Sequence, residues 1–500
     1  MDKGGFSMHL PIFYSAMLLT IVNLLLRLAG TVFQVYLSGR IGAAGIGLLQ
    51  LVMSVNALAV VAGIAGIRTA SMYLTAEEIG KKCKKAVSGV LSGCMLYSIL
   101  FSCSIAGLLY TFAPVIASEW ISYPETASAL RLFAMFLPVI CLCNVFVGYF
   151  TAANRIGTLA AVEVAEQLIS IVITLWALSF HNPQSPIAAC QSVILGSSSA
   201  ACFTLLCLFL LRLIEVPESC NHRLPMVQRL ADTALPLAMA DILKSGINTV
   251  ENLMVPKRLS LHALTPDPLA AFGVVSGMVF PVLMFPACIL FSLAELLIPE
   301  LARCSAAKSR MRISYLLQKT LRIAFLYALI FCGLEFLLAD YLCISLYDTP
   351  EAGKYLKLYA LLIPILYCDA MTDAMTKGLG QQKICVRYNI LTSAMDVVLL
   401  WFLLPKYGMM GYYVSFTLTH GINFFLSLRL LLTISGESIP FSTLLFAPAA
   451  MVLGICGAGF FSFPIARSLV FLLLLGSLWC LMNVTGWWDL LWLKSLVHKK

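Results

Sequence analysis

Charged residues are scarce in this chain. Asp, Glu, Lys and Arg make up only 11% of its 500 residues, whereas hydrophobic residues make up 60% and the mean hydropathy is +0.93. So few charges cannot cover a water-facing surface of this size, which excludes a soluble globular protein and a disordered one. The formal net charge of +9 is therefore better explained by membrane topology than by nucleic-acid binding.

Several signatures of chemistry are also missing. No phosphate-binding loop of the form G-x-x-x-x-G-K-[ST] occurs, and the 17 Cys and 6 His show no metal-ligand or disulfide spacing. The longest polar connection, residues 213–229, is too short to fold as a separate domain. We therefore expect no ATP-hydrolysing domain, no metal centre and no cofactor.

Long apolar runs fill the chain instead. Each spans about 20 residues or more, enough to cross a hydrocarbon core of roughly 30 Å. They predict an all-α integral membrane protein with about 14 transmembrane helices. The repeat and the polar stripes described below add the prediction of two pseudo-repeated lobes around a central cavity. The predicted spans are 11–38, 44–74, 86–112, 125–150, 158–180, 187–212, 229–255, 268–300, 313–338, 355–377, 384–404, 409–433, 440–463 and 466–489.

The basic residues predict the orientation. With the N-terminus placed in the cytosol, the inner connections contain 22 Lys and Arg, the outer connections contain seven, and four lie within spans. This asymmetry follows the positive-inside rule and predicts a multi-pass protein with both termini cytosolic.

The first predicted span is apolar except for one polar stripe. Asn23, Arg27, Thr31 and Gln34 recur at helical spacing along it. An ionisable group at bilayer depth is costly unless it faces a bundle interior or a water-filled path. Arg27 therefore predicts that this helix forms one wall of a polar cavity.

The seventh predicted span carries charges of both signs on one face. Asp241, Lys244, Asn248 and Glu251 lie at i, i+3, i+7 and i+10. The second predicted span contains Arg68, and the eighth contains Glu295. One interpretation is that these groups pair with one another, as Asp241 and Lys244 would within the helix, and fix packing. The interpretation we favour is a cavity that binds an anion, because arginine holds phosphate oxygens in a bidentate fork.

The two polar helices also suggest an internal repeat. Arg27 and Gln34 are seven residues apart, as are Lys244 and Glu251, and each pair precedes a small-residue segment, AAGIG (43–47) or LAAFG (269–273). Transporters are commonly built from such repeats. The repeat predicts an N-terminal lobe over 1–228, a C-terminal lobe over 229–433 and additional helices with a cytosolic tail over 434–500.

Acidic residues within the spans are the candidates for coupling to a cation or a proton. These are Glu251, Asp396 and Asp369; carboxylates in a low-dielectric site can hold a proton or bind a cation. Asp373 has a competing structural interpretation, because Lys377 follows it at i+4. Glu163 and Glu166, near the start of the fifth span, are interpreted as acids that favour the helix dipole.

Three segments carry a family resemblance: LLLRLAGTVFQVYLSGRIGAAGIGLLQL (24–51), GYFTAANRIGTLAAVEVAEQLISIVIT (148–174) and LPKYGMMGYYVSFTLTH (404–420). They resemble the polysaccharide-transport branch of the MATE/MOP flippase superfamily, including the stage V sporulation protein B family and the MurJ-type lipid II flippases. The resemblance implies two lobes, alternating access and an undecaprenyl-diphosphate-linked sugar as substrate. It also implies that Arg27, Arg68, Lys244 and Glu295 line the cavity and that Glu251 and Asp396 correspond to a sodium site of some relatives. Leu400 follows Asp396 where relatives often have a second polar residue, which leaves Na⁺, H⁺ or the membrane potential open as the driving force.

These observations predict a flippase of the bacterial cytoplasmic (inner) membrane for a lipid-linked oligosaccharide. The substrate would be a lipid II-like peptidoglycan or spore-cortex precursor, or a polysaccharide repeat unit. The expected partners are this substrate, membrane lipids and cell-wall synthesis enzymes. A cation-coupled multidrug or metabolite antiporter is the first alternative, disfavoured because such a protein needs acids more than a row of bases. A membrane glycosyltransferase or ligase is the second, disfavoured because the predicted external loops are short, and a structural scaffold is the third.

Overall fold

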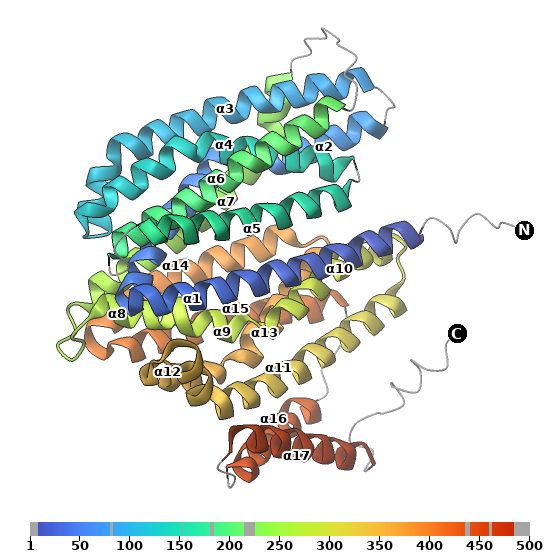
Figure 1. The fold of residues 1–500 in the computed structure, drawn as a ribbon. Helices are drawn as coiled ribbons and strands as arrows, with labels where there is room; N and C mark the ends of the chain where they lie inside the picture. The colour runs from blue at the N-terminus through green and yellow to red at the C-terminus, as the bar shows by residue number, and fades with distance from the viewer. Residues whose placement is uncertain are drawn as a thin grey trace, which may run out of the picture. The chain divides into compact units, whose positions relative to one another are not determined.

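The structure is a computed structural model that describes residues 9–80, 84–153, 155–180, 185–214, 226–435, 441–459 and 463–484 (Figure 1). Every regular element in these ranges is a helix, and no strand occurs in them. The all-α prediction is therefore confirmed. Residues 1–8 and 485–500, which contain most of the two predicted cytosolic tails and the end of the predicted span 466–489, lie outside the described residues.

The first six predicted spans correspond to six long helices and two short helical turns, Ile116–Trp120 and Pro124–Thr126. The long helices are α1 (His9–Ile64), α2 (Ile67–Gly80), α3 (Lys84–Val115), α4 (Ala127–Ala152), α5 (Ile156–Phe180) and α6 (Pro186–Ile214). The continuous run of α1 is broken at Gly42, where φ is +70°. A left-handed backbone favours glycine, and the break falls between the two predicted spans 11–38 and 44–74.

The remaining helices include two spans that are bent in the middle. The bounds are α7 (Met226–Leu259), α8 (Pro268–Gly273), α9 (Phe280–Met284), α10 (Ala287–Ala306), α11 (Arg310–Tyr347), α12 (Pro350–Ala360), α13 (Ile363–Gly378), α14 (Gln382–Tyr407), α15 (Met409–Ser435), α16 (Phe441–Ala458) and α17 (Pro464–Val484), with a π-helical turn at Val274–Val279. Pro268–Met284 and Ala287–Ala306 meet at 62°, and α12 and α13 meet at 55°. Pro286 and Pro364 lie at these bends, and a proline removes a backbone donor from the helix.

Eight helical stretches among the described residues are long and apolar enough to cross a membrane, and the two bent pairs would raise the number to ten. The polar helix α7 is not among them, and α1 with α2 forms a single stretch, Ile21–Ile79. The predicted number of 14 spans is therefore not confirmed and stays a prediction.

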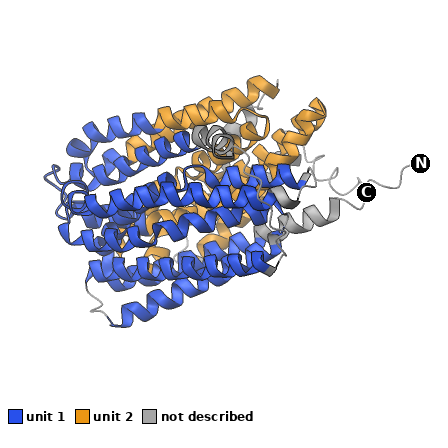
Figure 2. Cartoon of the chain, turned by 90° about the horizontal axis from the view of Figure 1, so that it is seen from above, with its two compact units in different colours: residues 1–277, 393–412 blue, residues 278–392, 413–500 orange. Residues whose placement is uncertain are grey.

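The chain divides into two compact units (Figure 2). Unit 1 contains Met1–Gly277 and Ser393–Tyr412, and unit 2 contains Met278–Thr392 and Tyr413–Lys500. The two units are defined by which residues contact one another in the structure. The lobes 1–228 and 229–433 and the appended segment 434–500 rest on the sequence repeat and stay predictions.

The core of unit 1 is a bundle of α2 to α6, and Ala238 and Ile242 of α7 pack with it. Its fully buried side chains include Ile67, Val90, Cys94, Phe150 and Leu208. Burying such apolar side chains stabilises the bundle in the parts that lipid does not reach, and close packing contributes most of that gain.

The two small-residue segments of the repeat contact each other inside unit 1. A Cβ atom on Gly47 would lie 2.4 Å from the carbonyl oxygen of Leu269, and one on Gly273 would lie 2.0 Å from the carbonyl oxygen of Ala43. Gly273 corresponds to Gly47 in the repeat, and Leu269 corresponds to Ala43. This reciprocity is what a local two-fold axis between two copies produces.

The core of unit 2 surrounds the bend between α9 and α10. The hydroxyl groups of Tyr367 and Tyr327 donate hydrogen bonds of 2.8 Å to the carbonyl oxygens of Leu283 and Pro286. Because no water is available at membrane depth, carbonyl groups released by a helix break need such internal donors. The two tyrosines therefore allow this span to bend.

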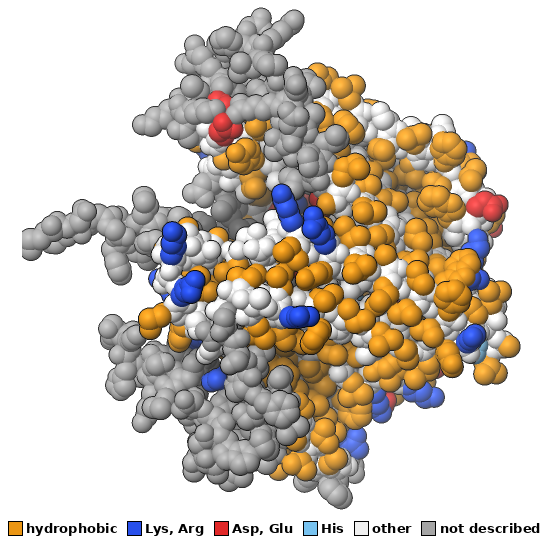
Figure 3. All heavy atoms as spheres, turned by 180° about the vertical axis from the view of Figure 1, so that it is seen from behind, with side chains coloured by type: hydrophobic (Ala, Val, Ile, Leu, Met, Phe, Trp, Pro, Cys, Tyr) orange, Lys and Arg blue, Asp and Glu red, His pale blue; other side chains and the backbone are white. Residues whose placement is uncertain are grey.

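The surface is consistent with a lipid environment. Hydrophobic side chains cover most of the face shown in Figure 3, and Leu25, Val32, Val172 and Trp176 are all more than half exposed. Exposed apolar area of this extent marks a surface that is not covered by water.

Candidate functional site

The polar stripe of the first span lies on α1 in unit 1. The Arg27 side chain is exposed, and the Thr31 hydroxyl donates a 2.9 Å hydrogen bond to the Arg27 carbonyl oxygen. The Gln34 amide nitrogen Nε2 donates to the carbonyl oxygen of Gly277 at 2.9 Å. Gln34 therefore holds the π-helical turn 274–279 against α1, in addition to its predicted role in substrate binding.

Three of the four residues of the mixed stripe of α7 are exposed, whereas Glu251 is not. Asp241, Lys244 and Asn248 are all exposed, and none of them forms an ion pair or a hydrogen bond with another described residue. The ion pair between Asp241 and Lys244, which the structural interpretation allowed, is therefore absent. Lys244 lies 18 residues after the start of α7 at Met226 and 15 before its end at Leu259, about 27 and 23 Å from the two ends.

Arg68 lies at the start of α2, directly after the break at Ala65 and Gly66. Its side chain is exposed, and its charge interacts with that of Glu163 on α5. One turn further, Glu166 accepts a 2.9 Å hydrogen bond from the Thr204 hydroxyl on α6.

Glu163 and Glu166 lie beyond the first turn of α5, which begins at Ile156. The helix dipole acts over the first turn only, so the interpretation of these acids as dipole partners is wrong. They belong to a polar cluster with Arg68 and Thr204 that the spacing within one helix could not reveal.

Glu251 and Asp396 come together in unit 1, although 145 residues separate them. The side chain of Glu251 on α7 lies against that of Asp396 on α14, and both lie close to Tyr412 at the start of α15. Asp396 is only 4% exposed. Two adjacent buried carboxyl groups repel each other when both are ionised. They are stable side by side only when a proton or a cation lies between them.

The other predicted acids lie in unit 2. Asp369 on α13 accepts hydrogen bonds of 2.9 and 3.0 Å from the Asn423 amide, and Nδ1 of His420 lies 3.9 Å from it. Glu295 on α10 is exposed and has no partner among the described residues. Asp373 forms a 2.6 Å ion pair with Lys377, as its structural interpretation predicts.

One buried acid was not singled out from the sequence. Glu335 on α11 is 4% exposed, and neither of its carboxyl oxygens has a hydrogen-bond partner in the described part of the chain. Its neighbours include Tyr327 and Cys332 on the same helix and Tyr367 on α13. Its position as the single acidic residue of the apolar run 313–338 could have indicated it from the sequence.

Comparisons with known proteins identify the family of the chain. The family described as polysaccharide biosynthesis protein matches residues 13–305, and the MatE family matches residues 236–402. Stage V sporulation protein B of Bacillus subtilis (strain 168) is 22% identical over 406 residues, which cover 79% of this chain and 78% of that protein.

Two solved structures share the fold. The lipid II flippase MurJ in an inward closed conformation has a TM-score of 0.68 at 14% identity, covering 95% of this chain and 98% of that one. An inward-facing multidrug resistance MATE transporter of the MOP superfamily has a TM-score of 0.66 at 13% identity, covering 84% and 100%.

The first family model spans more than half of the chain, and the relatives are transporters and flippases rather than enzymes. The glycosyltransferase alternative is thereby set aside. The chain belongs to the polysaccharide biosynthesis protein family, the polysaccharide-transport branch of the MATE/MOP superfamily of multi-pass membrane transporters.

Proposed function

We propose that this protein is a flippase of the bacterial cytoplasmic membrane that moves an undecaprenyl-diphosphate-linked oligosaccharide to the outer leaflet by alternating access. The similarity to stage V sporulation protein B and to a lipid II flippase supports a lipid-linked saccharide as the cargo. The glycan would be a peptidoglycan or spore-cortex precursor or a polysaccharide repeat unit, handed over to cell-wall synthesis enzymes.

The observation that best supports this proposal is the environment of Lys244. Its ammonium group is exposed near the middle of α7, and no carboxylate among the described residues neutralises it. An uncompensated cation at membrane depth is costly unless it faces water or an anion. A diphosphate headgroup would supply that anion, and Arg27 and Arg68, two exposed arginines of the same unit, would share it.

The pair of Glu251 and Asp396 is the proposed coupling site. A proton or Na⁺ held between the two carboxyl groups would be bound and released during each transport cycle. Asp369 is a less accessible candidate, because Asn423 already donates to both of its carboxylate oxygens. No cofactor beyond the coupling ion is proposed.

Leaflet accessibility tests the function directly. The purified protein is placed in proteoliposomes with a fluorescent undecaprenyl-diphosphate disaccharide, and a membrane-impermeant quencher reports the fraction in the outer leaflet over time. We expect the wild type to move the lipid, faster with an inward gradient of Na⁺ or H⁺. Lys244→Glu and Arg27→Glu should slow this movement at least tenfold, by about 1.4 kcal/mol or more.

Lys354→Glu is the matched control, because Lys354 is an exposed lysine on α12 outside the proposed site. It should move the lipid at the wild-type rate. Full rates in Lys244→Glu and Arg27→Glu would contradict the proposal, as would export of cationic drugs with no movement of the lipid by the wild type.

A further inference from the structure

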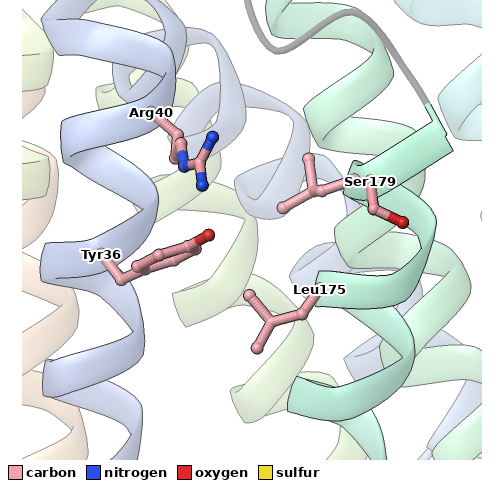
Figure 4. A pocket seen from close by; sticks show the side chains of 5 residues that line it. Tyr36, Arg40, Leu175 and Ser179 are labelled. Carbon is pink, nitrogen blue, oxygen red and sulfur yellow. The ribbon is translucent and has the colours of Figure 1, made fainter.

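A second basic site lies in unit 1, between α1 and α5. Tyr36 and Arg40 of α1 and Leu175, Leu178 and Ser179 of α5 line a pocket of about 90 Å³ (Figure 4). Figure 4 shows the Tyr36 ring and the Arg40 guanidinium extending from α1 toward Leu175. The two helices run alongside each other, since a Cβ on Gly30 of α1 would touch the Gln167 amide of α5 at 3.9 Å.

The charge in this pocket is unbalanced. The Arg40 guanidinium carbon lies 5.4 Å from the centroid of the Tyr36 ring, and Arg40 forms no ion pair or hydrogen bond with another described residue. The side chain is exposed. A guanidinium with five unused donors next to a tyrosine hydroxyl is a suitable partner for a phosphate group.

An apolar surface leads to this charge along both helices. On α1 the exposed side chains are Leu25, Leu28, Val32 and Tyr36, and on α5 they are Leu168, Val172, Leu175 and Trp176. At 100° per residue, the stripe on α1 lies nearly opposite Arg27 and Gln34. A helix whose polar stripe faces a transport path therefore turns this apolar stripe toward lipid.

The position of Arg40 along α1 matches the level expected for a lipid headgroup. Arg40 lies 13 residues beyond Arg27, about 20 Å further along α1, and two residues before the break at Gly42. On α5, Ser179 is the residue before the end of the helix at Phe180. Charge at the end of two apolar stripes matches the order of phosphate and acyl chain in a lipid.

We propose that this pocket binds the phosphate of an anionic phospholipid, with an acyl chain lying along the exposed stripes of α1 and α5. A membrane lipid suits the pocket better than the transported substrate, because a single guanidinium matches one phosphate and the apolar stripes lie on the side opposite Arg27. The bound lipid would seal α1 against α5 at the membrane surface.

Native mass spectrometry of the detergent-purified protein tests this site. Phosphatidylglycerol, phosphatidylcholine and inorganic phosphate are titrated separately into the delipidated protein. We expect one tightly held phosphatidylglycerol, weaker binding of phosphatidylcholine and no retained inorganic phosphate. Arg40→Gln should weaken phosphatidylglycerol binding roughly tenfold or more, because a charge-assisted hydrogen bond is lost.

Two further variants test whether the effect of Arg40→Gln is specific to this pocket. Arg131→Gln is the matched control, because Arg131 lies over Tyr110 at the same 5.4 Å but outside this pocket; it should bind the lipid like the wild type. Leu175→Trp fills the apolar wall with Arg40 in place and should also weaken binding. Wild-type binding by Arg40→Gln would overturn the proposal, as would an equal loss in Arg131→Gln or equally tight binding of inorganic phosphate.

Discussion

At the scale of single residues, we expect the contact between Glu251 and Asp396 to couple transport to an ion gradient. Glu251→Gln keeps the size and a hydrogen-bonding end but removes one of the two charges that a proton or cation would neutralise. We expect this variant to bind the lipid normally while losing the acceleration by a Na⁺ or H⁺ gradient. The proteoliposome assay, with and without each gradient, measures the difference.

The control for this variant is Glu351→Gln on α12, which replaces an exposed Glu at the start of the helix. It should respond to the gradient like the wild type. If Glu251→Gln also keeps its full response, the pair only fixes α7 against α14, and the driving force acts elsewhere.

Glu335 supports a prediction about stability. Both of its carboxyl oxygens are buried without a partner in the described residues, and an unsatisfied buried polar group is unfavourable. Glu335→Leu, which has a similar size, should raise the free energy of unfolding by about 1–3 kcal/mol. Thermal unfolding in detergent reports it as a higher midpoint, with Glu335→Lys expected to lower the folded yield. A drop in the midpoint for Glu335→Leu would mean that the carboxyl group has a partner such as a bound ion.

At the scale of elements, the crossing of the segment 43–47 with α8 depends on the absence of side chains. Gly273→Ala would place a Cβ 2.0 Å from the Ala43 carbonyl oxygen and 2.8 Å from the Gly47 nitrogen. Backbone atoms cannot yield as a flexible side chain does, so we expect a loss of stability of about 1–3 kcal/mol. Thermal unfolding and the yield of monodisperse protein measure it.

Gly246→Ala on α7 is the comparison for that substitution. Nothing lies within 4 Å of a Cβ at Gly246, and alanine is the better helix former by about 1 kcal/mol. This variant should be neutral or more stable. Equal losses in both variants would show that the close crossing contributes nothing specific.

At this scale the internal repeat is visible as a contact between its two copies. In the sequence it rests on two polar pairs and two small-residue segments of low identity. In the structure, Gly47 meets Leu269 and Gly273 meets Ala43, so equivalent positions contact each other reciprocally. A close crossing of two helices explains why both copies need small residues at these positions.

At the scale of the whole molecule, the predicted orientation is testable by labelling. Leu264 is 84% exposed in the connection before α8, and Met311 is 88% exposed near the start of α11. In a background in which all 17 native Cys are replaced, Leu264→Cys in intact cells should react with a membrane-impermeant maleimide. Met311→Cys should react only after the membrane is opened.

The opposite pattern would place both termini outside, against the distribution of Lys and Arg. Reaction of both variants in intact cells would mean that the bent span of α8 to α10 does not cross the bilayer. Each result is read as the fraction of protein labelled.

Much of the candidate site was accessible from the sequence, because a charge inside an apolar run is visible without coordinates. Arg27, Lys244, Glu251 and Asp396 were all found in this way, and the family was recognised from the segments around them. The sequence could not decide which charges pair, since spacing within one helix favours neighbours. Spacing therefore left open an ion pair between Asp241 and Lys244 that the structure does not contain, and it could not indicate that Thr204 is a partner of Glu166.

Composition and periodicity alone determined that this chain is a helical membrane protein with polar stripes at bilayer depth, because burying charge in lipid is too costly to occur without a function or a partner. Tertiary structure decided which stripes are exposed and which distant residues meet. Glu251 contacts Asp396 across 145 residues, Gln34 bonds to Gly277, and Arg40 joins the end of α5 to form a pocket. These contacts depend on how the helices pack, and packing is a property of several helices together that no single run of residues encodes.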